Sequence, residues 1–453
     1  MRPSIRIGNG CGFWGDNLDA PIALAQEGRL DYLTLEYLAE LTMSILALQK
    51  QRKPDAGYAT DFIDVLTRLA PILSEQPKLK IITNAGGMNP LACANKAREV
   101  LNAAGLHHKK IALVTGDDLY PRLDELLNAG HALQHLDTGE PLQTIHSRVV
   151  SANAYLGSAP IAEALRLGAD IVITGRVADA SLTLAPAMHE FAWRPDDWDR
   201  LCAGTAAGHL IECGAQVTGG LWCQWEAVPQ FALQGYPIAE IEASGLFRIT
   251  KPEGSGGIVN EETVGEQLLY EVGDPAAYLT PDVTADFTSL RLTDQGQDIV
   301  TVSDARGKPA TSFYKVSIAY RDGYTATGTL ALYGQNAVEK ARLAGQIIFD
   351  RLQRAGFSYQ RKNIEVIGAG DIVPGLAIPT SPREVMLRVS VHDANQTAVE
   401  RFTKEFAPLV TAGPPGVTGY TTGRAAVRQV FAYWPSLIAK SAVQAKVQLE
   451  CPA

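Results

Sequence analysis

The sequence has no block of basic residues, no apolar run long enough to cross a bilayer and no closely spaced pair of cysteines. Its 40 Lys and Arg against 49 Asp and Glu give a net charge of −9, which argues against nucleic acid as a partner. The first residues lack a basic segment followed by an apolar one, so neither a secretory leader nor a membrane anchor is predicted. The six cysteines include no CxxC pair, which excludes a zinc ribbon and fits a reduced compartment. We therefore expect a cytoplasmic protein that binds a small molecule.

What the sequence does contain is enough apolar material for a full core. Hydrophobic residues make up 46% of the 453 residues and charged residues 20%, as in globular proteins. The length favours two domains. We place the first at residues 1–285 and the second at 286–453, because segments after Ser289 alternate like antiparallel strands, with Asp322-Gly323 as a hairpin turn. The second domain is predicted to be a smaller α+β unit.

In the first domain, short apolar strands alternate with helical segments. The predicted strands are Ser4–Ile7, Tyr32–Leu35, Lys80–Thr83, Lys110–Val114 and Asp170–Ile173. The predicted helices cover residues 18–26, 38–49, 62–73, 90–104, 119–128 and 159–167. This alternation predicts an α/β fold with a mostly parallel sheet and helices on both faces. The pattern leaves open whether the sheet closes toward a barrel.

Polar residues follow each of these five strands. They include Glu36, Asn84, Asp117, Asp118 and Arg176. Turn chemistry explains the glycines at the same positions but explains these side chains less well. Because ligands of α/β folds bind at the carboxyl ends of the strands, we expect the five ends to form one polar crevice.

The segment Gly204–Gly220 carries an imidazole, a carboxylate and a thiol at helical spacing. His209, Glu212 and Cys213 would share one face of a helix, and Thr218-Gly219-Gly220 follows as a turn. Glycines on both sides allow close approach of a ligand. The same pattern is typical of a tightly packed helix that ends at Gly214, so both interpretations stay open.

The first loop, Gly10-Cys11-Gly12-Phe13-Trp14-Gly15, fits the dinucleotide pattern G-x-G-x-x-G, and Glu36 follows about 20 residues later. Phe13 and Trp14 are bulky where a pyrophosphate would lie. Asp16 places a negative charge near the helix start that would receive the phosphates. We therefore favour Asp16 as a helix-start or catalytic carboxylate, with a nicotinamide-dependent dehydrogenase as the weaker alternative.

The chain resembles the acyclic terpene utilisation, or AtuA-like, family. The resemblance rests on a series of blocks spread over the first three quarters of the chain. They are GNGCGFWGD at 8–16, DYLTLEYLAELT at 31–42, NAGGMNP at 84–90, SANAYLG at 151–157, GADIVITGRVAD at 168–179, GHLIECGAQVTGG at 208–220, KPEGSGG at 251–257 and QLLYEVGDPAAYLTPDV at 267–283. It implies a catabolic enzyme of citronellol or geraniol breakdown that acts on a branched acid or its CoA thioester, by carbon–carbon cleavage or by adding or removing water. The resemblance supplies no established catalytic residues.

A lyase or hydratase needs a group that transfers a proton, donors for an enolate oxygen and a cation for a carboxylate. The catalytic candidates are His209, Glu212, Asp117, Asp16 and, if its thiol pKa is lowered, the nucleophile Cys213. The substrate-binding candidates are Arg176 for a carboxylate and Asn84, Gly86, Gly87, Asn153, Thr218, Gly219, Gly220 and Lys251 as polar or backbone contacts. Carboxylates at Glu36, Asp117 and Asp118 would suit magnesium or manganese.

A second class of function stays open beside the enzyme. The chain could be a non-catalytic subunit that binds an acyl-CoA or assembles another pathway enzyme, which a large exposed apolar surface would indicate. We expect a homo-oligomer, and in the subunit alternative a second, small polypeptide as well.

Overall fold

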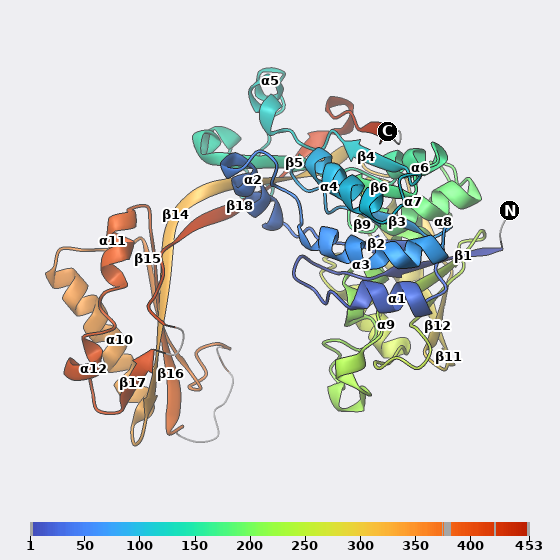
Figure 1. Ribbon diagram of the computed structural model, residues 1–453. Helices are drawn as coiled ribbons and strands as arrows, with labels where there is room; N and C mark the ends of the chain where they lie inside the picture. Colours follow the sequence, from blue (N-terminus) through green and yellow to red (C-terminus); the bar gives the residue numbers. More distant parts are fainter. Residues whose placement is uncertain (1–2, 374, 376–381, 421–422, 451–453) are drawn as a thin grey trace. The chain divides into compact units, whose positions relative to one another are not determined.

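The computed structural model describes residues 3–373, 375, 382–420 and 423–450, and the chain divides into two compact units (Figure 1). The first contains residues 1–319 together with 433–453, and the second contains residues 320–432. The boundary that we predicted near Ala285 falls inside the first unit.

The first unit is built on a ten-stranded sheet with the order β11-β12-β8-β7-β1-β2-β3-β6-β4-β19. The members are β1 Ser4–Asn9, β2 Tyr32–Leu35, β3 Lys80–Thr83, β4 Ile111–Thr115, β6 Ile171–Thr174, β7 Ile238–Glu242, β8 Phe247–Thr250, β11 Arg291–Gly296, β12 Ile299–Ser303 and β19 Lys446–Glu450. The five strands predicted from the sequence, β1, β2, β3, β6 and β4, are parallel neighbours at its centre. The flanking strands all pair antiparallel. The sheet is therefore mixed, and the prediction of a mostly parallel sheet holds only for its central part.

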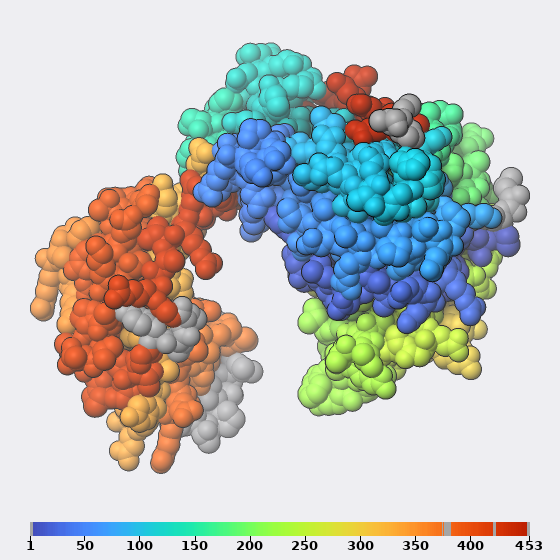
Figure 2. Space-filling view, viewed as in Figure 1, coloured from blue at the N-terminus to red at the C-terminus, as the bar shows by residue number. Residues whose placement is uncertain are grey.

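Helices cover this sheet, and short strands complete the unit. The helices are α1 Ala20–Glu27, α2 Thr42–Arg52, α3 Asp61–Glu75, α4 Pro90–Ala103, α5 Leu123–Asn128, α6 Ala159–Arg166, α7 Ser181–Phe191, α8 Trp198–Glu212 and α9 Glu261–Leu269. The remaining strands are β5 Val149–Ala154, β9 Tyr278–Leu279, β10 Thr284–Asp286 and β13 Arg306–Lys308. Helices α1, α3 and α4 form a continuous layer, blue to cyan in Figure 2, and bury one core with the central strands.

Local sequence explains where several of these helices begin. The Asn89 side chain accepts the backbone N–H of Ala92 and Pro90 occupies the first turn of α4, where its missing N–H costs nothing. Asn260 and Thr263 form a reciprocal capping box at the start of α9. Among the described residues, no helix is long and apolar enough to cross a membrane.

The second unit is an antiparallel sheet with helices packed against it. Its sheet has the order β15-β16-β14-β17, and β18 also pairs with β14. Its elements are β14 Phe313–Tyr333, which begins in the first unit, α10 Ala337–Arg354, β15 Arg361–Ile367, β16 Glu384–Asp393, α11 Gln396–Phe402, α12 Leu409–Ala412, β17 Val417–Tyr420 and β18 Arg428–Ala439, which ends in the first unit. The predicted hairpin at Asp322-Gly323 is wrong, because β14 continues through it and Tyr324 already pairs with Asp393 of β16.

Candidate active site

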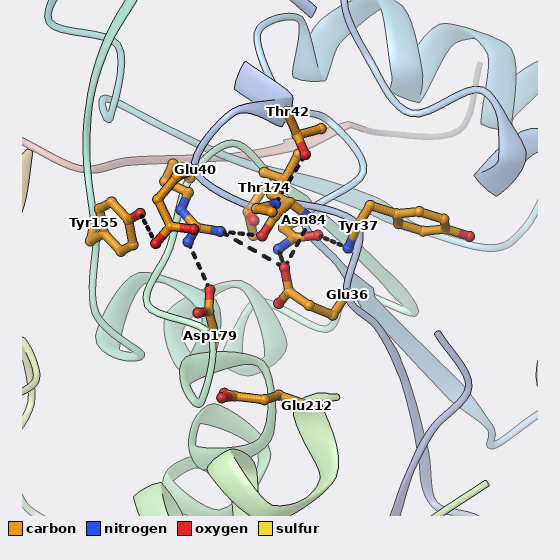
Figure 3. A network of polar contacts seen from close by, with 12 residues as sticks. Glu36, Tyr37, Glu40, Thr42, Asn84, Tyr155, Thr174, Asp179 and Glu212 are labelled. Atoms are coloured by element: carbon orange, nitrogen blue, oxygen red, sulfur yellow. Dashed lines mark hydrogen bonds and ion pairs between the residues drawn. The ribbon is translucent and has the colours of Figure 1, made fainter. Parts of the chain in front are cut away.

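The carboxyl ends of the central parallel strands carry a connected polar network (Figure 3). Asn84, after β3, is fully buried and donates its amide hydrogen to Glu36, which follows β2. The Asn84 oxygen accepts the backbone N–H of Tyr37 at 2.8 Å, and Glu36 accepts that of Leu38 at 3.1 Å. Burial raises the pKa of Glu36 well above its ordinary value, and nearby Asp179 raises it further, against the opposing charge of Arg176.

Arg176, after β6, is the cation of this network. Its side chain is 1% exposed and pairs with Asp179 at 3.0 Å and with Glu36 at 3.9 Å. It also donates to the Leu38 carbonyl at 2.7 Å and stacks on the Tyr155 ring at 4.1 Å. The guanidinium contacts protein anions and a carbonyl and also lines the smaller of the two cavities, so its role as a clamp for a substrate carboxylate stays a prediction.

Asp117 contacts the backbone of Arg176 and is 3% exposed. One of its oxygens accepts the Arg176 backbone N–H at 2.8 Å and the Asn153 amide at 2.9 Å. Gly175 permits this approach, since a Cβ there would lie 2.4 Å from the carboxylate. Burial raises the pKa of Asp117 to about 6. Asp117 and Asn153 line neither of the two cavities described below, so the structure gives them a supporting place rather than the predicted contact with substrate.

His209 and Glu212 stand at the end of α8, as the helical spacing predicted. His209 Nδ1 lies 3.0 Å from the Glu212 carboxylate, and both side chains are largely buried. Burial raises the pKa of Glu212 to about 7 even though His209 opposes the shift. Burial alone would lower the pKa of His209, but the Glu212 charge and hydrogen bond outweigh it, so that pKa is raised.

The surroundings of α8 fix the position of this pair. Gly204 and Gly208 let α8 pack closely on α7, since a Cβ at Gly208 would lie 2.6 Å from the Ala180 carbonyl. Asn9, at the end of β1, donates to the terminal carbonyls of Ile211 and Glu212 at 2.7 and 2.9 Å. The interpretation as a tightly packed helix end is therefore confirmed, and the interpretation as a site stays a prediction, to which the position of Glu212 at a cavity wall is relevant.

Two adjoining cavities, of about 560 and 470 Å³, open beside the network. They share four carboxylate residues, Glu40, Asp179, Glu212 and Glu271. The larger cavity is also lined by His209, Tyr155, Lys315 and apolar residues that include Leu279, Phe313 and Leu437. The smaller is also lined by Glu36, Arg176, Cys213, Asp16 and apolar residues that include Phe13, Leu221 and Tyr270. Both cavities thus combine an acidic common wall with apolar side chains.

Two of the predicted catalytic residues have other environments than we expected. Burial and the charge of Glu212 raise the pKa of Cys213 to about 12, so its thiol stays protonated and the condition for a nucleophile is not met. Asp16 accepts the backbone N–H groups of Gly12 and Asn17 and the Tyr236 hydroxyl, at 2.6 to 2.8 Å. This carboxylate therefore holds the first loop in place.

The first loop also lacks the features of a dinucleotide site. Its Gly12 N–H points at Asp16 rather than at open space, and a Cβ at Gly12 would lie 2.8 Å from the Cys213 backbone carbon. The glycine is needed because the loop packs against the end of α8. The geometry does not favour the dehydrogenase alternative.

The predicted glycine, threonine and lysine contacts are mostly internal to the protein. Gly86 and Gly87 are buried, and a Cβ at Gly86 would lie 2.5 Å from the Thr174 carbonyl. Thr218 is fully buried and donates to the Gly235 carbonyl at 2.7 Å, next to Gly219, which has a φ of +103°.

The other two predicted substrate contacts, Lys251 and Gly220, lie in different places in the first unit. Lys251 pairs with Asp298 at 2.9 Å and donates to the Ser255 carbonyl, so it ties its own loop to the β11–β12 turn. Gly220 lines the smaller cavity, and its contact with a substrate stays a prediction.

The predicted metal ligands do not come together. In the part of the chain that the structure describes, no group of three or more His, Cys, Asp or Glu side chains could hold a metal ion. Glu36 accepts a hydrogen bond from Asn84, and Asp117 accepts one from Asn153. Asp118 accepts the backbone N–H of Tyr120 at 3.1 Å. The expected magnesium or manganese set at Glu36, Asp117 and Asp118 is therefore corrected to three separate hydrogen-bonding positions.

These features define an α/β protein with two adjoining, acidic and partly apolar cavities at the carboxyl edge of its central parallel strands. The chain belongs to the acyclic terpene utilisation family, since the model described as "Acyclic terpene utilisation family protein AtuA" matches residues 5–449. The match covers both units, so it confirms and extends the resemblance seen in the first three quarters of the sequence. No curated protein and no solved structure matches the chain.

Proposed function

We propose that this protein is an acid–base enzyme, a lyase or hydratase, that acts on the acyl part of a branched hydroxyacyl thioester in acyclic terpene utilisation. The observation that carries the proposal is Glu212. Its carboxyl has a pKa of about 7, contacts His209 and forms part of the wall shared by both cavities. A group with a pKa near the working pH is best suited to take up and release a proton.

The shared wall supplies a second acid–base group. Asp179 also lines both cavities, 36% of its side chain is exposed, and burial raises its pKa despite its pair with Arg176. Removing water from a hydroxyacyl group needs one base for the proton next to the carbonyl and one acid for the departing hydroxyl. Two carboxyl groups in one wall fit this pair of tasks, and the same pair could serve carbon–carbon cleavage.

The charge around the cavities favours an uncharged acyl group over a free acid. Four carboxyl groups form the shared wall, and the buried Arg176 is already paired with Asp179 and Glu36. A free carboxylate next to this wall would meet like charges, whereas a thioester carbonyl carries none. Membership of the acyclic terpene utilisation family and the apolar lining support a branched hydrocarbon chain as the rest of the substrate.

Hydrogen exchange at the carbon next to the carbonyl tests this proposal before the product is known. Branched 3-hydroxyacyl-CoA thioesters are incubated with the protein in D₂O and followed by mass spectrometry. We expect deuterium uptake and loss of water or chain cleavage, and a fall of about 10²- to 10⁴-fold in the Glu212→Gln variant. The exposed Glu226→Gln is the matched control and should retain the wild-type rate. Equal rates in wild type and Glu212→Gln would contradict the assignment.

One observation favours a second candidate, a subunit that binds acyl-CoA and docks on another protein. The connection after α8 exposes four large apolar side chains, Leu221, Trp225, Phe231 and Leu233, which are 46 to 82% exposed. Exposed apolar groups of this kind are typical of contact with a further chain, either a second copy or a small partner. This candidate predicts thioester binding without exchange or turnover, and a change of particle mass when Leu221 and Trp225 are replaced by Ser.

A further inference from the structure

Two hydrogen-bond donors of the larger cavity converge on one oxygen atom. The Tyr155 hydroxyl and the Lys315 ammonium group both lie 3.4 Å from Oε1 of Glu40. Tyr155 follows β5, Lys315 lies on β14 within the first unit, and Glu40 precedes α2. Three separate segments thus build one point at which a negatively charged oxygen is surrounded by donors (Figure 3 shows Tyr155 and Glu40).

The two donors are held in place by their surroundings. Tyr155 is 6% exposed, and its ring carries the Arg176 guanidinium at 4.1 Å and the Lys315 ammonium at 4.8 Å. Burial raises the pKa of Tyr155 to about 12, so the phenol keeps its proton and can donate it to an acceptor. A preorganised pair of donors of this kind stabilises an oxygen on which negative charge develops.

Glu40, in contrast, is attached loosely to this point. Its side chain is 45% exposed, and its two hydrogen bonds to Tyr155 and Lys315 are long. Burial would raise the pKa of Glu40, but its own backbone N–H and the charges of Arg176 and Lys315 lower it below the ordinary value. The position therefore favours an anion, and the carboxylate that fills it can move into the cavity.

We propose that Tyr155 and Lys315 form an oxyanion subsite for the acyl oxygen of the substrate, and that Glu40 occupies this subsite until the substrate displaces it. The identity of the oxygen rests on the proposed function, whereas the binding of an anion does not. In that reaction, removal of the proton next to the carbonyl leaves its electron pair in an enolate, whose oxygen receives both donors. Departure of the hydroxyl group with one proton as water then restores the carbonyl and leaves the unsaturated acyl group.

Binding of acetate tests the subsite without any turnover. Acetate is titrated by calorimetry into wild type, Glu40→Ala and the double variant Glu40→Ala/Lys315→Met. We expect acetate to bind Glu40→Ala at least about tenfold more tightly than wild type, because a charge-assisted hydrogen bond becomes available to it. The double variant should lose this gain. Equal affinities in wild type and Glu40→Ala, or a gain that survives Lys315→Met, would overturn the proposal.

Two further variants separate the subsite from general effects. Glu271→Gln removes another carboxylate of the same wall and should leave acetate affinity within about twofold of wild type, since a solvent-exposed charge is screened. If Glu40→Ala fails to fold, Glu40→Gln keeps the side-chain volume and should show a smaller gain in affinity. If acetate affinity rose as much in Glu271→Gln as in Glu40→Ala, the gain would reflect only the loss of repulsion between acetate and the acidic wall. That result would refute a specific subsite.

The kinetics of the donor variants identify the oxygen that is bound. If it is the enolate oxygen, Tyr155→Phe and Lys315→Met lower kcat of the exchange reaction with little change in KM. Acetate binding that follows these rules in a protein without exchange activity would keep the subsite and reject the proposed function. If neither substitution changed the exchange activity, the proposed function would stand and the proposed subsite would be refuted.

Discussion

Replacing Arg176 by Met would show whether this guanidinium supports the fold or contacts a substrate. The side chain is 1% exposed, pairs with Asp179 and Glu36 and donates to the Leu38 carbonyl. Removing one partner of a buried ion pair costs about 3–5 kcal/mol, because the other charge is left without compensation. Asp179 is 36% exposed and can regain water, so we expect the lower end, about 3 kcal/mol of unfolding free energy.

Tryptophan fluorescence in urea measures this loss in the relevant part of the molecule. The six tryptophans of the sequence are Trp14, Trp193, Trp198, Trp222, Trp225 and Trp434, and all lie in the first unit. Their emission therefore reports the unfolding of the unit that contains Arg176. This matters because a chain of two units need not unfold in one step, and a free energy of unfolding is defined only for a single two-state transition.

The sign of the pH dependence provides an internal check. The pKa values of Glu36 and Asp179 are already raised in the folded protein, and removal of Arg176 raises them further. A carboxyl whose pKa is higher in the folded than in the unfolded state destabilises the fold fully above the folded pKa, progressively less as pH falls below it, and not at all below the unfolded pKa. The loss in Arg176→Met should therefore be larger at pH 8 than at pH 5.

Lys315→Met is the matched control, because the Lys315 side chain is 43% exposed and its ammonium group pairs with Glu40 only at 3.4 Å. Exposed pairs contribute about 0–1 kcal/mol, so this variant should unfold close to wild type. A loss below about 1 kcal/mol in Arg176→Met, independent of pH, would refute the supporting role of the guanidinium.

Three further substitutions test the roles of Asp117, Gly12 and Cys213. Asp117→Asn should stabilise the protein at pH 8 by up to about 3 kcal/mol and leave it unchanged at pH 4, because burial raises the carboxyl pKa to about 6; denaturant titration at both pH values measures this. Gly12→Ala should cost about 1–3 kcal/mol by the same titration, through contact with the end of α8, whereas Gly273→Ala, with no neighbour within 4 Å, should not. Cys213→Ala should retain exchange activity, and iodoacetamide should label exposed Cys223 before Cys213; loss of activity would return the thiol to the list of catalytic groups.

The centre of the fold follows from local patterns in the sequence. Tyr32–Leu35 and Lys80–Thr83 were predicted with the observed bounds, since each is a short apolar run that ends at polar residues. The edges of the sheet depend on pairings between distant segments. β19 joins the sheet beside β4 near the end of the chain, and no local pattern in its residues indicates that partner.

The hairpin at Asp322-Gly323 failed for a local reason. Gly323 has a positive φ of +80°, as a turn would require, but this conformation occurs inside a continuous strand. A Cβ at this position would lie 2.7 Å from the Asp393 carbonyl, so glycine is needed for close approach of β16. The dipeptide indicates a backbone conformation with positive φ. Whether this conformation forms a hairpin turn or lies within a continuous strand depends on how the partner strand pairs.

The candidate site was predicted in part. Glu212 and Glu36 were named from helical spacing and from strand ends, whereas Asp179, Glu40 and Lys315 were missed. Asp179 lies three residues after Arg176 and Glu40 four residues after Glu36, but both pairs lie in loops that follow strands, where helical spacing gives no signal. Lys315 offered none, because it lies in the segment that we had assigned to the other domain.

Two carboxyl oxygens of the network lack a hydrogen-bond partner and could pair with a ligand. Among the described residues, Oε2 of Glu36 and Oε2 of Glu212 have no hydrogen-bond partner although both atoms are buried, and both residues line the smaller cavity. A network that served stability alone would satisfy such atoms, since an unpaired buried acceptor costs about 1–3 kcal/mol. The pKa values of both carboxyl groups are raised, so each free oxygen can carry a proton and donate as well as accept, and a ligand hydroxyl group can pair with it in either state. The hydroxyacyl substrate that we propose would supply such a hydroxyl group, whose departing oxygen the adjoining carboxyl group could protonate.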